Sequence, residues 1–116
     1  MAFARRRRLA RGQQFARKRA SFGDVRVDFD RMELMRKGAE VRLTVTEFKL
    51  LAFLLRNPKR VVSRKELLDA IWGYRPDPAT RTVDMHIAKL RQKVERDPAN
   101  PIHVRTVHCA GYKFVP

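Results

Sequence analysis

Segment 80–96 combines an apolar stripe with basic and polar side chains that could contact a charged partner. Val83, Ile87, Leu90 and Val94 recur at spacings of four, three and four, which predicts one buried face of a helix. The opposite side carries basic, polar and small residues: Arg81, Thr82, Met85, Ala88, Lys89, Gln92 and Arg96, with His86 and Lys93 at its margins. Arginine and lysine can pair with guanine in the major groove of double-stranded DNA, and a methionine can lie against a thymine methyl group. A solvated charged face would show the same pattern, so the neighbouring elements must decide.

Other reactive residues form no recognisable catalytic or metal-binding pattern. The sequence has no Gly-rich phosphate loop, no plausible pair of catalytic carboxylates and no nucleophile with an evident base. His108 and Cys109 are adjacent and His103 lies nearby, but this spacing matches no zinc pattern. We therefore expect a protein that is not an enzyme and that holds no cofactor and no metal.

The charge balance indicates a polyanionic partner. The chain has 27 Lys and Arg against 12 Asp and Glu, a formal net charge of +15 and a pI near 11.3. Eight of the basic residues and none of the acidic ones fall within residues 1–21, which we interpret as a basic flexible tail or interdomain linker that binds phosphates non-specifically. Basic residues still outnumber acidic ones in 22–116.

Length and hydropathy limit the architecture to one globular domain without a membrane span. A chain of 116 residues accommodates one core, and 44% hydrophobic residues can fill it. No apolar run approaches the roughly 20 residues of a membrane helix. A single cysteine, Cys109, excludes an internal disulfide and favours a reducing compartment, so we expect a cytoplasmic protein.

The elements expected around segment 80–96 are a sheet, two helices and a hairpin. Residues 22–43 alternate with period two and predict three short antiparallel strands, with a turn at 37–38. Thr44 to Glu47 and Ser63 to Glu66 each have the form of a capping box and open helices that end near Asn57 and Gly73. Ile102 to Cys109 and Tyr112 to Val115 predict two strands around a turn at 110–111. The whole predicts an α+β winged helix-turn-helix domain over 22–116, with a three-helix core at 44–96 and a hairpin wing at 102–116.

Three stretches carry a resemblance to a known family. LTVTEFKLLAFLLRNPKRVVSRKELLDAIWG (43–73), TRTVDMHIAKLRQKVE (80–95) and VRTVHCAGYKF (104–114) resemble the winged-helix effector domains of OmpR/PhoB response regulators, and the resemblance runs through 22–116. It implies transcriptional regulation as the output domain of a two-component system: a dimer bound to tandem half-sites on promoter DNA, and a loop that contacts RNA polymerase. In this chain the RNA polymerase loop falls at Gly73, Tyr74, Arg75, Pro76 and Asp77.

The resemblance also implies roles for individual residues. Arg81, His86, Lys89 and Arg91 match positions that contact DNA, and Met85 matches an apolar base contact. The full predicted DNA-binding set adds residues near phosphates, on the polar face and on the wing: Trp72, Thr46, Thr82, Gln92, Lys93, Thr106 and His108.

The chain departs from the family pattern at three places. Ala88 stands where a second recognition-helix arginine is common, and His108-Cys109-Ala110-Gly111-Tyr112 replaces the Arg-Gly-x-Gly-Tyr of the wing. We expect no receiver domain in this chain, because residues 1–21 cannot form it; the chain would be either a fragment of a longer regulator or a stand-alone DNA-binding protein. The alternative function is a basic module that binds RNA or nucleoid DNA without reading sequence, although few aromatic residues fall outside apolar patterns.

Overall fold

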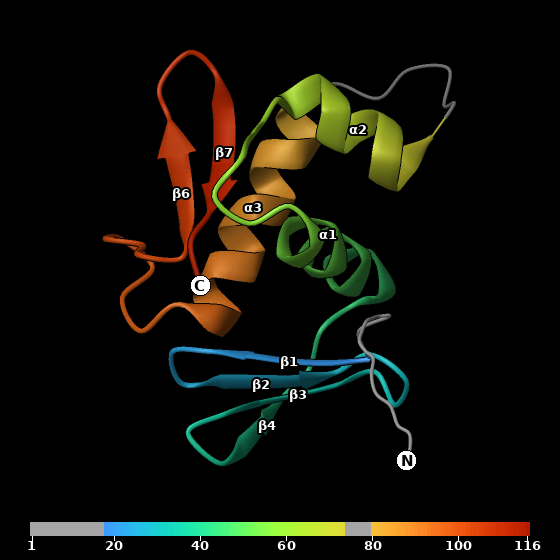
Figure 1. The fold of residues 1–116 in the computed structure, drawn as a ribbon, viewed down its shortest axis with the longest axis vertical. Helices are drawn as coiled ribbons and strands as arrows, with labels where there is room; N and C mark the ends of the chain where they lie inside the picture. Colours follow the sequence, from blue (N-terminus) through green and yellow to red (C-terminus); the bar gives the residue numbers. More distant parts are fainter. Residues whose placement is uncertain (1–17, 74–79) are drawn as a thin grey trace, which may run out of the picture.

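The computed structural model describes residues 18–73 and 80–116 and contains two sheets and three helices (Figure 1). The elements follow in the order β1 (Arg19–Phe22), β2 (Val25–Asp28), β3 (Glu33–Arg36), β4 (Ala39–Val41), α1 (Val45–Arg56), β5 (Val61–Val62), α2 (Arg64–Trp72), α3 (Thr80–Val94), β6 (Val104–Val107) and β7 (Gly111–Phe114). This arrangement confirms the predicted α+β winged-helix class. No helix in these two ranges is long and apolar enough to cross a membrane.

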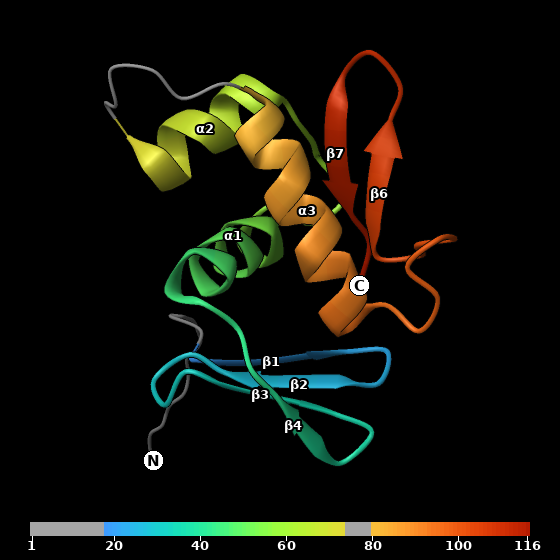
Figure 2. The ribbon, with the colours of Figure 1, turned by 180° about the vertical axis from the view of Figure 1, so that it is seen from behind.

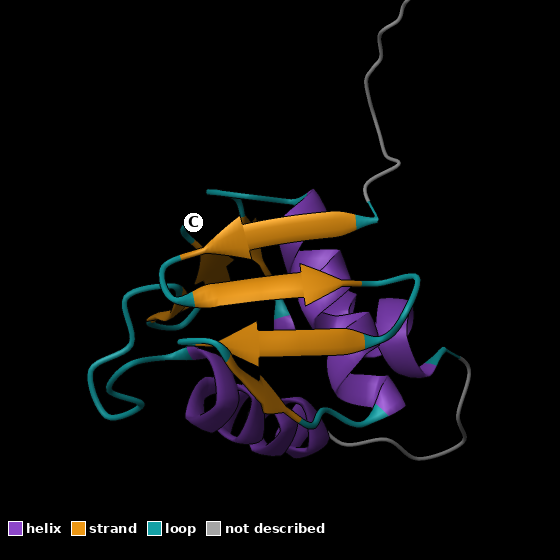
Figure 3. Ribbon diagram, turned by 90° about the horizontal axis from the view of Figure 1, so that it is seen from below, coloured by secondary structure: helices purple, strands orange, loops and turns teal. Residues whose placement is uncertain are grey.

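The N-terminal sheet has four antiparallel strands in the order β1-β2-β3-β4, and it forms a layer with the helices on one side (Figure 3). Phe22, Val25, Val27 and Leu34 are buried on the helix side, as the period-two pattern predicts. Three strands from residue 22 were expected, and β1 was missed. Ala20 pairs with Val27, and the strand starts at Arg19, so residues 19–21 belong to the sheet and not to the tail. The arginine-rich segment before β1 concealed a strand that has only two apolar residues.

Side-chain caps fix where the first two helices begin. At α1 the Thr44 hydroxyl accepts from the Glu47 N–H (3.1 Å) and Glu47 Oε1 accepts from the Thr44 N–H (2.8 Å), which confirms the predicted capping box. At α2 the Ser63 hydroxyl accepts from the Glu66 N–H at 3.0 Å, but the Glu66 carboxylate does not return to the cap. The expected second capping box is therefore only half formed.

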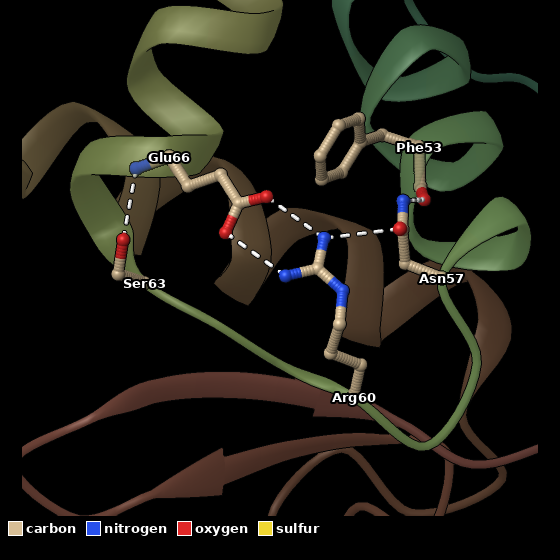
Figure 4. Close-up of polar contacts among 5 residues, drawn as sticks. All are labelled: Phe53, Asn57, Arg60, Ser63 and Glu66. Carbon is tan, nitrogen blue, oxygen red and sulfur yellow. Dashed lines mark hydrogen bonds and ion pairs between the residues drawn. The ribbon is translucent and has the colours of Figure 1, made fainter.

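Glu66 is instead held by Arg60 in a polar network that joins the end of α1 to the start of α2 (Figure 4). The Arg60 guanidinium donates to both Glu66 carboxylate oxygens, at 3.2 and 2.8 Å, and to Asn57 Oδ1 at 3.0 Å. Asn57 in turn donates from its amide to the Phe53 carbonyl at 2.8 Å. A two-pronged bond to a charged guanidinium is stronger than a neutral backbone N–H contact, which explains why Glu66 turns away from the cap.

The C-terminal hairpin is part of a three-stranded sheet in the order β5-β7-β6. The two-residue strand β5, which periodicity could not detect, pairs Val61 and Val62 with β7. Gly111 at the start of β7 adopts φ 140°, and a Cβ there would collide with the Val62 carbonyl oxygen. Phe114 is fully buried, and its ring meets that of Phe22 edge to face with centroids 4.9 Å apart, so the base of the hairpin belongs to the common core.

Candidate nucleic-acid interface

Helix α3 presents one open face and has a neighbour on each flank. Val83, Ile87, Leu90 and Val94 are buried, as predicted. The opposite side exposes Arg81, Met85, Ala88, Lys89 and Gln92, with Met85 54% exposed. Figures 1 and 2 show α3 between the β6–β7 hairpin on one side and helices α1 and α2 on the other. The exposed face therefore lies between the hairpin and the other helices.

The cations on and just after α3 fall into two groups. Within the described ranges, ion pairs involve Lys93 with Glu47 and, beyond the helix end, Arg96 with Asp24. Arg96 donates from two nitrogens to the Asp24 carboxylate, each at 3.0 Å. No ion pair in these ranges includes Arg81 or Lys89, which leaves both of these cations available to a polyanion.

On the α2 side, an aromatic contact fixes His86. The rings of Trp72 and His86 meet edge to face with centroids 5.0 Å apart. His86 Nδ1 donates to the Thr82 carbonyl oxygen at 2.8 Å, so its Nε2 is the ring nitrogen left for another partner. Thr82, His86 and Trp72 are each half-buried, and they form the margin of the exposed face.

On the α1 side, Lys93 is committed to a buried carboxylate. Lys93 Nζ lies 2.7 Å from Glu47 Oε1; the Lys93 side chain is 29% exposed and the Glu47 residue 1%. Burial by itself raises the pKa of Glu47, but the hydrogen bonds from Lys93 and Thr44 and the positive charge of Lys93 outweigh it and hold that pKa below its ordinary value. Thr46, half-buried in the first turn of α1, precedes Glu47. Lys93, a predicted DNA contact, is thus neutralised within the fold.

On the hairpin side, Asp84 and Arg91 bind the wing. The Tyr112 hydroxyl donates to Asp84 Oδ1 at 2.6 Å, and Arg64 Nε donates to the same oxygen at 2.7 Å. Burial raises the pKa of Asp84, but the hydrogen bonds from Tyr112 and Arg64 lower it by more, so the net shift of this pKa is downward. Burial, then the bond to Asp84, raises the pKa of Tyr112. Asp84 is therefore a carboxylate, and Tyr112 a neutral phenol, at neutral pH.

Arg91 was predicted to contact DNA, and its guanidinium bonds to the hairpin. Nε donates to the Val104 carbonyl at 2.9 Å and Nη2 donates to the Thr106 hydroxyl at 2.7 Å. The guanidinium carbon also lies 5.5 Å from the centre of the Tyr112 ring. Arg91 accordingly sits between helix and wing.

The wing strands are shorter than predicted, and the turn between them spans 108–110 instead of 110–111. Strands were expected at 102–109 and 112–115, but β6 and β7 span Val104–Val107 and Gly111–Phe114. Cys109 adopts φ 63° in the turn, and the Ala110 N–H donates to the Val107 carbonyl at 2.9 Å. Thr106 and His108, the two predicted wing contacts, are exposed beside this turn.

Glu95 anchors the other end of the hairpin. Its carboxylate, on a residue only 1% exposed, accepts from the backbone N–H groups of Ile102 (2.9 Å), His103 (3.0 Å) and Val104 (2.7 Å). These bonds replace the solvent that a buried carboxylate loses. The end of α3 is thereby tied directly to the start of β6.

Sequence reasoning missed the side chains that position α3. Glu47, Arg64, Asp84, Glu95 and Tyr112 each hold α3 or the hairpin, and their partners are 7 to 46 residues away. One signal was present: Asp84 is an acidic residue inside a basic helix, and such a residue calls for a nearby cation. Of the predicted polymerase loop, Gly73 is exposed at the end of α2, while Tyr74, Arg75, Pro76 and Asp77 lie outside the described residues.

Residues 38–114 match the family described as "Transcriptional regulatory protein, C terminal". The chain belongs to this family. The DNA-binding response regulator MtrA of Mycolicibacterium smegmatis is 43% identical over 111 residues, which are 96% of this chain and 49% of that protein. The chain thus spans about half the length of the curated relatives it matches.

Solved structures of this family agree in fold. The response regulator DrrB of Thermotoga maritima, an OmpR/PhoB homologue, superposes with a TM-score of 0.77 at 34% identity, covering 85% of this chain and 45% of DrrB. The DNA-binding domain of Klebsiella pneumoniae RstA, solved in complex with the RstA box, superposes with a TM-score of 0.74 at 30% identity, covering 85% of this chain and 98% of that one. In this chain, α3 with the β6–β7 hairpin is the candidate interface. The family is one of regulators, not of enzymes.

Proposed function

We propose that this chain is the output domain of a response regulator and regulates transcription by binding double-stranded DNA in a sequence-specific manner. One observation carries the proposal: the exposed face of α3 presents Arg81 and Lys89, free of ion pairs within the described residues, together with Met85 and Gln92. The neighbouring cations Lys93 and Arg96 pair with acidic groups, and Arg91 bonds to the hairpin. The cations Arg81 and Lys89 therefore share the exposed face of α3, while the guanidinium of Arg91 is directed to the hairpin.

This face has the chemistry of major-groove recognition. The major groove, about 12 Å wide, admits an α-helix and displays hydrogen-bonding groups that differ for each base pair. Met85 and Lys89 are one turn apart at the middle of α3, where side chains can reach base edges, while Arg81 lies in the first turn. We assign the base contacts to Met85, Lys89 and Gln92, and contacts at the margin of the groove to Thr82, His86, Trp72 and Thr46.

The wing and the remaining basic residues supply sequence-independent contacts in this proposal. Thr106 and His108 are exposed near the hairpin turn, and we assign them contacts with phosphates or the adjacent minor groove. Residues 1–17, outside the described part, carry six arginines and no acidic residue. A chain of this charge binds any duplex through phosphates and loses affinity as salt increases.

The wider assembly is also a proposal. RstA binds its box through a domain that this chain covers almost completely in structure, which supports DNA as the partner here. By the family resemblance, we further propose a dimer on tandem half-sites and an RNA polymerase contact through residues 73–79. Changing this loop should leave DNA binding intact and remove activation from a bound promoter.

Selection of bound duplexes from a random DNA pool tests the function. We expect one enriched motif, repeated in tandem, since direct base contacts discriminate by about 1–3 kcal/mol per pair. A pool that stays random after repeated rounds would favour the alternative, a basic module that binds nucleic acid through charge alone.

A further inference from the structure

The Tyr112 side chain is the centre of a polar cluster that joins three elements. We call Arg64, Asp84, Arg91, Thr106 and Tyr112 the Tyr112 cluster. The Tyr112 ring has guanidinium carbons of Arg64 and Arg91 at 5.9 and 5.5 Å from its centre, and its hydroxyl donates to Asp84 at 2.6 Å. These residues come from α2, α3 and the hairpin, so the cluster links the start of α2, the recognition helix and the wing.

The Tyr112 cluster contacts the hairpin close to its turn. Thr106 and Tyr112 are cross-strand partners, one pair below the closing pair Val107 and Gly111. Arg91 touches both members of this pair, through the Thr106 hydroxyl and the Tyr112 ring. Any change in these bonds therefore acts on the end of the hairpin that carries His108 and Cys109.

The base of the hairpin is held by other means. Phe114 is fully buried, β5 pairs with β7 through Val61 and Val62, and the Glu95 carboxylate binds three N–H groups at the start of β6. The fold of the hairpin thus has support that does not pass through the Tyr112 hydroxyl. Without that hydroxyl the sheet should still form, but the orientation of the wing relative to α3 should change.

The cluster also covers the acidic side chain of the recognition helix. The Asp84 side chain is 40% exposed, and it lies on the same helix as the DNA-facing residues. An unpaired carboxylate there would repel phosphates. Arg64 Nε and the Tyr112 hydroxyl both donate to Asp84 Oδ1, so the negative charge of Asp84 is compensated by groups of the protein itself.

We propose that Tyr112, Asp84 and Arg91 are positioning residues, which hold the wing at a fixed angle to α3 so that helix and wing engage one duplex together. This inference rests on the proposed DNA-binding function. In this proposal Arg91 connects α3 to the hairpin and does not itself contact DNA. The DNA contacts of the wing are made by hairpin residues such as Thr106 and His108.

Tyr112→Phe tests the inference, because it removes one hydroxyl and keeps the ring. On the selected duplex we expect about a tenfold loss of affinity, equivalent to about 1.4 kcal/mol. Hydroxyl-radical footprinting should show lost protection on the side of the site that the wing covers, with protection by α3 retained. The salt slope should also fall by about one unit if a phosphate contact is lost.

Glu66→Gln provides the matched control. It weakens the Arg60–Glu66 network of Figure 4, which ties α1 to α2 without touching the hairpin. Both variants are compared at a temperature where unfolding curves show them fully folded. We expect Glu66→Gln to keep the complete footprint; a purely structural role for Tyr112 would give both variants the same footprint and overturn the proposal.

A second variant covers the case in which Tyr112→Phe does not fold. Asp84→Ala removes the acceptor of the Tyr112 hydroxyl at a residue that has no DNA contact in this proposal, and it should show the same loss of wing-side protection. An intact wing footprint in either folded variant refutes the positioning role. If the wild-type chain selects no duplex motif at all, the proposed function itself fails, and that outcome is recognised before any variant is made.

Discussion

Lys93→Ala tests whether Lys93 stabilises the fold or contacts DNA. The sequence pattern groups Lys93 with the polar face of α3, but in the structure its ammonium group lies 2.7 Å from a Glu47 carboxylate on a residue 1% exposed. Removing the lysine leaves a buried carboxylate without its counter-charge. Breaking a buried pair in this way costs about 3–5 kcal/mol.

The geometry places the expected loss at the lower end of that range. The Lys93 side chain is 29% exposed, and the Thr44 N–H still donates to Glu47 at 2.8 Å in the variant. We therefore expect the free energy of unfolding to fall by about 3 kcal/mol at pH 7, a large share of the 5–15 kcal/mol typical of a domain. Urea unfolding followed by circular dichroism measures this directly.

The pH dependence of stability gives an independent check. In the wild type the pKa of Glu47 is lowered on folding from its ordinary 4.5, so the stabilisation is present above that pH and is lost as the pH falls through the folded value. In Lys93→Ala burial is no longer opposed by the ammonium, so the pKa of Glu47 rises and the variant loses stability as pH increases. The difference in the free energy of unfolding between the wild type and Lys93→Ala should therefore become smaller as the pH falls from 7 to 4.

Lys89→Ala is the matched control for this measurement, since Lys89 is exposed on the same helix one turn earlier. Its unfolding free energy should stay within about 0.5 kcal/mol of the wild type. The reasoning is refuted if Lys93→Ala unfolds like the wild type while its affinity for every duplex falls, because Lys93 would then be the phosphate contact that the sequence pattern suggested.

Three further predictions follow from the same geometry. Lys89→Ala should weaken binding to the selected duplex by about 1–3 kcal/mol and flatten the preference at one base pair, whereas an equal loss on selected, single-base variant and random duplexes at two salt concentrations would deny it a base contact. Deleting residues 1–17, which spares β1, should weaken binding to all duplexes alike and leave the selected motif unchanged; a truncated chain that keeps its affinity for random DNA but loses its motif would contradict this. Gly111→Ala should lower the free energy of unfolding by about 1–3 kcal/mol through backbone strain, with a further loss from the collision with the Val62 carbonyl; a wild-type melting curve would show that β5 does not approach β7 so closely.

Periodicity predicted the elements whose signal is local. The spacing of Val83, Ile87, Leu90 and Val94 located α3 and its buried face, and Thr44 with Glu47 located the start of α1. Two short strands, β1 and β5, escaped because two apolar residues do not establish a period.

Partners across the chain could not be predicted, and they decide which cations are free. No residue near Lys93 in the sequence indicates that its partner is Glu47, which is 46 residues away. Likewise, the sequence around Arg91 does not indicate Thr106 as its partner. A helical wheel gives the direction of a side chain relative to one helix axis, whereas its partners depend on how other elements pack against that helix. The wheel therefore identified the exposed face but not the partners of the side chains at its margins.

Competition binding tests the central claim most directly, that the exposed face of α3 reads duplex DNA. Labelled selected duplex bound to the chain is displaced by unlabelled selected duplex, random duplex or single-stranded RNA of equal length at physiological salt. We expect the selected duplex to compete at concentrations at least about 10³-fold lower than either of the other two. Displacement by single-stranded RNA as effective as that by the selected duplex would contradict the claim and leave a basic protein that binds nucleic acid by charge.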